Sequence, residues 1–194
     1  MSSPYSDLRE DFFRSYFSKA LPYDAYLQTG EKAQASRWHD YADKISLSPE
    51  LAGRVRAFIR KMPILVMSGI WCGDCARQGP MLRLIEQANP LLEFRYIDNR
   101  QNPELQNELR INGAEKVPVV VSFSEDFYEL SRFGDRHLSV YRRKLETETG
   151  AACDPGFGSP EAELEAELEE WVNHFERLQA ILRLAPMLRR RYSD

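Results

Sequence analysis

Two cysteines separated by two residues are the part of this sequence best suited to chemistry. They are Cys72 and Cys75, in the run Trp71-Cys72-Gly73-Asp74-Cys75. Two intervening residues let both sulfurs meet across one turn of chain, so a disulfide can close and open with little rearrangement. The thiolate is both the nucleophile of disulfide exchange and a metal ligand. The spacing therefore predicts either a redox-active thiol pair or half of a metal site.

The position of the pair predicts a different role for each thiol. A continuous apolar run at residues 64–67 reads as a buried strand, and residues 75–89 read as a helix. Unpaired N–H groups and a partial positive charge at the helix N-terminus favour the thiolate of Cys72. Cys75 lies within the helix, so we expect it to resolve the mixed disulfide that Cys72 forms.

Asp74 lies between the cysteines and has two interpretations. Its negative charge disfavours a nearby thiolate, so Asp74 should raise the Cys72 pKa and can take part in proton transfer to Cys75. Alternatively, the carboxylate caps the helix and its charge is spent on backbone N–H groups.

Zinc is the main alternative for such a cysteine pair. A tetrahedral zinc site needs four ligands, usually from a second cysteine pair or a spaced histidine pair. The remaining candidates are Cys153, His39, His137 and His174, and none of them has a partner at that spacing. We therefore expect no bound metal and no organic cofactor. Cys153 reads either as an ordinary loop cysteine or as a regulatory thiol.

The elements that must position the pair predict an α/β fold. Two strand–helix–strand steps imply parallel pairing, and a short acidic turn at Glu125-Asp126 implies an antiparallel edge. The result is a mixed four-stranded sheet with helices on both faces. The expected strands are residues 64–67, 91–98, 117–123 and 127–133, and the expected helices are residues 75–89, 102–112 and 136–148.

Helical segments flank this central unit on both sides. Apolar residues at helical spacing mark residues 6–20, 31–45 and 49–62, and Ser48-Pro49 is typical of a helix N-cap followed by a first-turn proline. An apolar stripe also marks a long C-terminal helix. The predicted organisation is a helical extension packed on the core (1–61), a central domain (62–148), a linker (149–159) and an amphipathic helix (160–194).

The composition argues against several classes of protein. The chain has 194 residues and a net charge of -4, which gives no electrostatic reason to bind nucleic acid or anionic membrane. Its N-terminus lacks the basic and apolar regions of a secretory signal, and its apolar runs are too short to span a bilayer. Three cysteines do not make a disulfide scaffold. We expect a cytoplasmic protein without nucleic-acid or membrane partners.

Taken together, residues 63–148 resemble the thioredoxin superfamily. WCGDC after an apolar strand resembles its WCxxC active site, and Pro80 stands where the family has a helix-kinking proline. FRYIDNRQNPEL resembles the family's second strand and its exit. KVPVVVSF resembles the loop and strand that carry the family's cis-proline, and Phe133-Gly134 resembles its glycine after the last strand. The resemblance implies a thioredoxin-like fold.

The resemblance also implies roles for residues near the pair. Pro118 would be cis, and the backbone of Val117 would bond an extended substrate chain, while Trp71 and Gly73 would complete the substrate-binding surface. Without the cysteine pair, Pro118 would read as an ordinary trans turn proline.

This sequence departs from the family pattern at three positions. Val66 replaces a buried aspartate, Phe94 replaces the lysine often paired with it, and Asp74 replaces a proline. These departures place ordinary thioredoxin kinetics in doubt, but they leave the dithiol intact.

The sequence thus predicts a thiol–disulfide oxidoreductase that reduces protein or low-molecular-weight disulfides through Cys72 and Cys75. Its partners would be a disulfide-bearing protein or small-thiol substrate, and a reductase or low-molecular-weight thiol as electron donor. The alternative is an interaction or adaptor protein that uses the same scaffold with little turnover.

Overall fold

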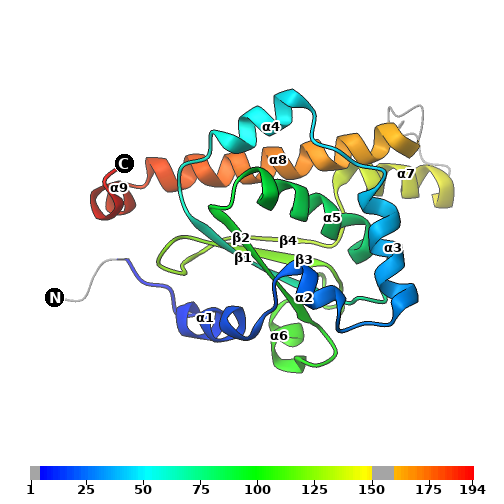
Figure 1. Cartoon of the computed structure of the whole chain (residues 1–194). Coiled ribbons are helices and arrows are strands. Elements are labelled where there is room, and N and C mark those ends of the chain that lie inside the picture. The colour runs from blue at the N-terminus through cyan, green and yellow to red at the C-terminus, as the bar shows by residue number, and fades with distance from the viewer. Residues whose placement is uncertain (1–4, 150–159) are drawn as a thin grey trace.

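The computed structural model describes residues 5–149 and 160–194 and centres on a four-stranded sheet (Figure 1). The parallel pair β1–β2 lies on one side, and β3 runs antiparallel to both β1 and β4. This confirms the predicted mixed sheet. In the spatial order β2-β1-β3-β4, the strands are β1 (Met62–Ser68), β2 (Leu92–Asp98), β3 (Val119–Phe123) and β4 (Glu129–Gly134).

Helices cover both faces of the sheet, as predicted. In Figure 1, α5 (Gly73–Ala88) and α8 (Pro160–Leu184) lie above it, and α1 (Glu10–Lys19) and α6 (Pro103–Glu108) lie below. Ring contacts mark the two layers. Phe94 of β2 meets Phe175 of α8 with ring centroids 5.5 Å apart, and Phe13 of α1 meets Phe123 of β3 at 5.1 Å. All seven residues of β1 are buried, because this central strand is covered on both sides.

The N-terminal segment continues with α2 (Tyr23–Leu27), α3 (Lys32–Ala42) and α4 (Pro49–Arg56). The cap predicted for α4 is present, since the Leu51 N–H donates to the Ser48 hydroxyl at 3.2 Å. However, α4 ends earlier than expected, because the chain must extend before Met62, where β1 begins. The five-residue α2 was not predicted, since so short a helix leaves no periodic pattern.

Besides the Phe13–Phe123 contact, two further features hold this N-terminal segment against the central domain. Leu21 exchanges two main-chain hydrogen bonds with Tyr96, of 2.9 and 2.7 Å, and so extends the sheet edge at β2. Trp38 of α3 is fully buried against α5. A Cβ atom at Gly79 would lie 2.0 Å from the Trp38 ring, so only glycine permits this approach of the two helices.

The C-terminal part consists of α7 (Leu138–Thr149), α8 and α9 (Pro186–Tyr192). The apolar stripe predicted for residues 160–194 is buried along α8, with Trp171 and Phe175 fully inaccessible. The expectation of one continuous helix was wrong. The helix ends at Leu184, because a proline at position 186 cannot continue the backbone hydrogen bonds. The predicted linker and Cys153 lie outside the described residues, apart from Thr149.

Candidate active site

The two cysteines lie where β1 turns into α5. Cys72 is the N-cap residue of α5, with an extended backbone, and its thiol is partly accessible. Cys75 is in the first turn of the helix and only 1% exposed. The Cys72 N–H donates to the Gly69 carbonyl at 2.9 Å, and the Gly69 N–H donates to the Cys75 sulfur at 3.4 Å. Both described cysteines are free thiols, with one facing the surface and the other behind it.

The pKa values of the two thiols are shifted in opposite directions. The Cys75 thiol donates a hydrogen bond to Cys72 and, together with the backbone N–H groups of Cys75 and Asp74, lowers the Cys72 pKa to about 6. Burial and the Asp74 charge oppose this change. Burial raises the pKa of Cys75 well above its ordinary value, and the neighbouring Cys72 raises it further. The difference therefore comes from the burial of Cys75, from its hydrogen bond to Cys72, and from the backbone N–H groups at the helix N-terminus that stabilise the outer thiolate.

The Val117–Pro118 loop lies directly against the outer thiol. The Cys72 sulfur is 3.7 Å from the Val117 carbonyl oxygen, and the Val117–Pro118 peptide is cis. Pro118 precedes β3, so its missing N–H leaves the strand ladder intact. A Cβ atom at Gly134 would lie 2.9 Å from the Pro118 carbonyl oxygen, which explains a glycine at the end of β4.

Asp74 is tied to an ion-pair network rather than to the helix backbone. Its carboxylate pairs with Arg136, which also pairs with Asp135 at 2.9 Å. Asp135 further contacts Lys116 at 3.3 Å and accepts a hydrogen bond from Tyr141. These contacts lower the Asp135 pKa even though burial opposes that change. The network therefore joins α5, the loop before Pro118 and the start of α7.

The N-terminal segment also reaches this site, which sequence reasoning missed. Arg37 of α3 donates to the Trp71 carbonyl at 3.3 Å, and the Trp38 indole N–H donates to the Ile70 carbonyl at 3.1 Å. Arg100, which follows β2 and is not part of this segment, also reaches the site, with its guanidinium carbon 4.1 Å from the centroid of the Trp71 ring. The periodicity of α3 indicated that Trp38 is buried, but no signal in the chain links it to residue 70.

Two of the three positions that depart from the family pattern, Val66 and Phe94, are buried in apolar surroundings. Val66 is 2% exposed within β1, and Phe94 is fully buried against Phe175. Tyr96, which faces Val66 across the parallel pair, is also fully buried. The sheet near Cys75 is therefore apolar at these positions, and residue 66 supplies no carboxylate that could take a proton from the buried thiol.

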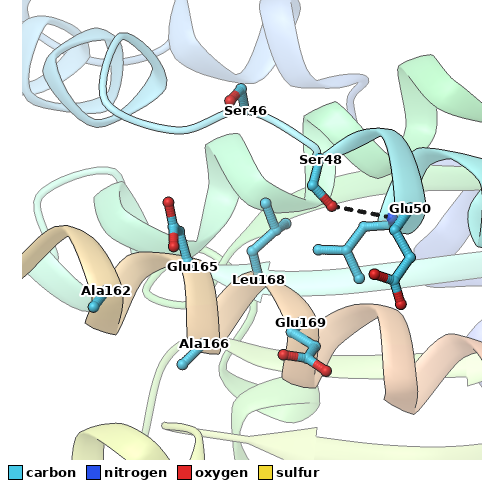
Figure 2. A pocket seen from close by; sticks show the side chains of 9 residues that line it. Ser46, Ser48, Glu50, Ala162, Glu165, Ala166, Leu168 and Glu169 are labelled. Carbon is cyan, nitrogen blue, oxygen red and sulfur yellow. Dashed lines mark hydrogen bonds between the residues drawn. The ribbon is translucent and has the colours of Figure 1, made fainter. Parts of the chain in front are cut away.

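A separate surface pocket of about 410 Å³ lies between the α3–α4 connection and α8 (Figure 2). Neither described cysteine lines it, and its polar groups are two serines and three glutamates. The pocket is lined by Ser46, Ser48, Glu50, Leu51, Ala162, Glu165, Ala166, Leu168 and Glu169.

In the described parts of the chain, no group of three or more His, Cys, Asp or Glu side chains is placed to hold a metal ion. Every described helix is too short or too polar to cross a bilayer.

Comparison with known proteins places this site in context. The family profile described as thioredoxin matches residues 20–142. No curated protein sequence matches significantly. A crystal structure of a protein of unknown function from Pseudomonas aeruginosa aligns with a TM-score of 0.62 at 20% identity, covering 86% of this chain and 94% of that one. An HIV epitope scaffold aligns with a TM-score of 0.61 at 20% identity, covering 87% and 93%. Both likenesses concern the fold.

Proposed function

Since this chain belongs to the thioredoxin family, we propose that it is a thiol–disulfide oxidoreductase that reduces protein or low-molecular-weight disulfides. One observation carries the proposal. A partly accessible Cys72 with a pKa lowered to about 6 stands in front of a buried Cys75 whose pKa is raised. At neutral pH this arrangement supplies one thiolate for attack and holds one protonated thiol in reserve.

The proposed reaction has two exchange steps. The Cys72 thiolate attacks one sulfur of the substrate disulfide, and the other sulfur leaves as a thiolate. Cys75 then loses its proton and attacks the Cys72 sulfur, which forms the Cys72–Cys75 disulfide and releases the second substrate thiol. Two electrons pass from the dithiol to the substrate. An external reductase or low-molecular-weight thiol must then return the pair to the reduced state.

The surface around Cys72 supports binding of an extended substrate chain. The Val117–Pro118 loop lies beside the attacking sulfur, so a substrate main chain laid along Val117 would bring its disulfide to Cys72. Trp71 is 36% exposed and contributes an apolar rim. The Gly73 position leaves room for the Arg37 guanidinium, 3.2 Å from where a Cβ atom would stand.

Asp74 is proposed to tune the outer thiol. Its charge raises the Cys72 pKa, and its pairing with Arg136 limits that effect.

Insulin reduction driven by dithiothreitol tests the proposal. We expect turnover with the wild-type chain, none with Cys72→Ser, and a stalled mixed disulfide with Cys75→Ser, because the resolving thiol is then missing. The Cys75→Ser variant should also trap the physiological substrate in a cell extract. If there is no turnover and Cys72 is unreactive, the chain is instead an adaptor protein on the same scaffold. The apolar residues Val66 and Phe94, which replace the family's aspartate and lysine, favour that alternative.

A further inference from the structure

Two buried hydroxyl groups lie behind the Cys75 thiol, with Ser68 next to the sulfur and Tyr26 next to Ser68. Tyr26 of α2 is 2% exposed, and Ser68, the last residue of β1, is fully buried. Neither hydroxyl has a hydrogen-bond partner of standard geometry among the described residues. The Ser68 hydroxyl nevertheless acts on both neighbours, since it lowers the pKa of the Cys75 thiol and of the Tyr26 phenol. Buried polar groups without partners are uncommon in folded proteins and call for an explanation.

The fold brings Tyr26 to this place from outside the central domain. The main-chain pairing of Leu21 with Tyr96 fixes the start of α2 at the sheet edge. The Tyr26 ring then stacks on Tyr96 with centroids 5.6 Å apart. Tyr96 faces Val66 across the parallel pair, and Val66 and Ser68 share one face of β1. Tyr26 therefore covers the sheet face that ends at Ser68, next to the buried thiol.

We propose that Tyr26 and Ser68 donate the hydrogen bonds that stabilise the Cys75 thiolate while it resolves the mixed disulfide. This inference rests on the proposed function. In that step the Cys75 S–H bond breaks, a sulfur–sulfur bond forms between Cys75 and Cys72, and the bond from Cys72 to the substrate sulfur breaks. The substrate sulfur leaves with the electron pair and ends as a thiol, taking up the proton that Cys75 gave up.

Burial of the Cys75 thiol is the main reason that such donors are needed. Burial is the largest cause of the raised Cys75 pKa, and the Cys72 thiolate adds to it in the reduced protein. In the mixed disulfide Cys72 carries no charge, so burial remains as the main obstacle. Burial raises the pKa of the Tyr26 phenol and keeps it protonated, and the charges of the cysteines and of Asp98 at the end of β2 add to this effect. Tyr96, which stacks on Tyr26, is also kept protonated by burial. A protonated phenol can donate to the sulfur.

Reaction with the aromatic disulfide dithiobis(nitrobenzoate) separates the two steps. Attack by Cys72 releases the first coloured thionitrobenzoate, and resolution by Cys75 releases the second. We expect Tyr26→Phe to leave the first release unchanged, to slow the second about tenfold, and to move the pH midpoint of the second upward by about one unit. Ser68→Ala should act in the same direction.

Tyr23→Phe is the matched control. Tyr23 lies on the same helix, is 5% exposed and also contacts Trp38 and Tyr96, but its phenol responds to Asp24 and Arg83 rather than to the cysteines. Both releases should therefore be unchanged in Tyr23→Phe. The fold should tolerate Tyr26→Phe, because the ring stays and only an unpartnered hydroxyl is lost.

The outcomes are distinguishable. An unchanged second release and pH midpoint in a folded Tyr26→Phe would overturn this inference and leave the proposed function standing. Equal slowing in Tyr23→Phe would overturn it too, because the effect would then come from packing. A wild-type chain that releases no thionitrobenzoate from Cys72 would overturn the proposed function and this inference together.

Discussion

The two helical segments outside the central domain are attached to it in different ways. The N-terminal segment, residues 5–61, reaches the site directly through Arg37 on the Trp71 carbonyl, Trp38 on the Ile70 carbonyl and Tyr26 near Cys75. Its helices α2 and α3 form one wall of the thiol site. Removing that segment would therefore alter the chemistry as well as the stability.

The C-terminal helix α8 is attached through packing and buried charge. Trp171 and Phe175 stack within the core at 5.5 Å. Arg77 of α5 pairs with Glu163 at 2.8 Å and with the fully buried Glu167. Burial raises the Glu167 pKa even against the Arg77 charge, which is the ordinary cost of a buried ion pair. This helix completes the fold, and its described contacts lie with α4, α5, α7, α9, β2 and β4 rather than with the thiols.

Replacing one buried tryptophan in each segment gives the largest contrast. Trp38→Ala and Trp171→Ala each remove a fully buried ring, so each should lower the free energy of unfolding by about 3–5 kcal/mol. Only Trp38→Ala should also change the rate and pH midpoint of Cys72 alkylation, because Trp38 holds the turn before Cys72. Urea unfolding and iodoacetamide labelling measure the two effects. Similar alkylation changes in both variants would refute the distinction.

Acid should weaken the attachment of the C-terminal helix. Burial, with the nearby His137 and Arg177 charges, lowers the pKa of His174 from 6.5 to about 4. Between these values the unfolded chain binds more protons than the folded one, so the free energy of unfolding falls as the pH falls through that window. At ~1.4 kcal/mol per unit the loss is at most about 3 kcal/mol.

Unfolding of His174→Phe across the same pH range measures this contribution. The variant should show a shallower loss of stability on acidification, whereas His39→Gln, at an exposed position of α3, should follow the wild type. If His174→Phe and wild type lose stability in parallel, the acid response arises elsewhere.

The smallest expected effect concerns Asp74. Asp74→Asn should lower the Cys72 pKa from about 6 by less than one unit, since Arg136 already neutralises part of the carboxylate charge. The reduction potential should rise by at most about 30 mV. Arg136→Gln should act in the opposite direction by leaving Asp74 unpaired. Thiolate absorbance titrations measure both shifts, and an unchanged pKa with reduced thermal stability in Asp74→Asn would favour the capping role.

Local signals were sufficient for most of the fold. The apolar run at residues 64–67 lies inside β1, the Ser48-Pro49 cap begins α4, and the stripe after residue 160 is buried along α8. These patterns depend on neighbours in the chain, and so they can be read without tertiary information. The five-residue α2 and the break before α9 were not predicted. The first is too short to show a helical period in its apolar residues, and the second depends on a single proline.

The sequence by itself determined the thiol pair, its place at the start of a helix and the fold that presents it. The lowered Cys72 pKa follows in part from that local geometry, because backbone N–H groups at a helix N-terminus stabilise the outer thiolate. The raised Cys75 pKa comes mainly from burial, which depends on tertiary packing. Only the tertiary structure decided what surrounds the pair. Arg37 and Tyr26 come from a segment whose residues give no sign of the site, and Asp74 finds Arg136 across 62 residues of chain. Contacts between distant residues depend on how whole elements pack, which no local pattern records.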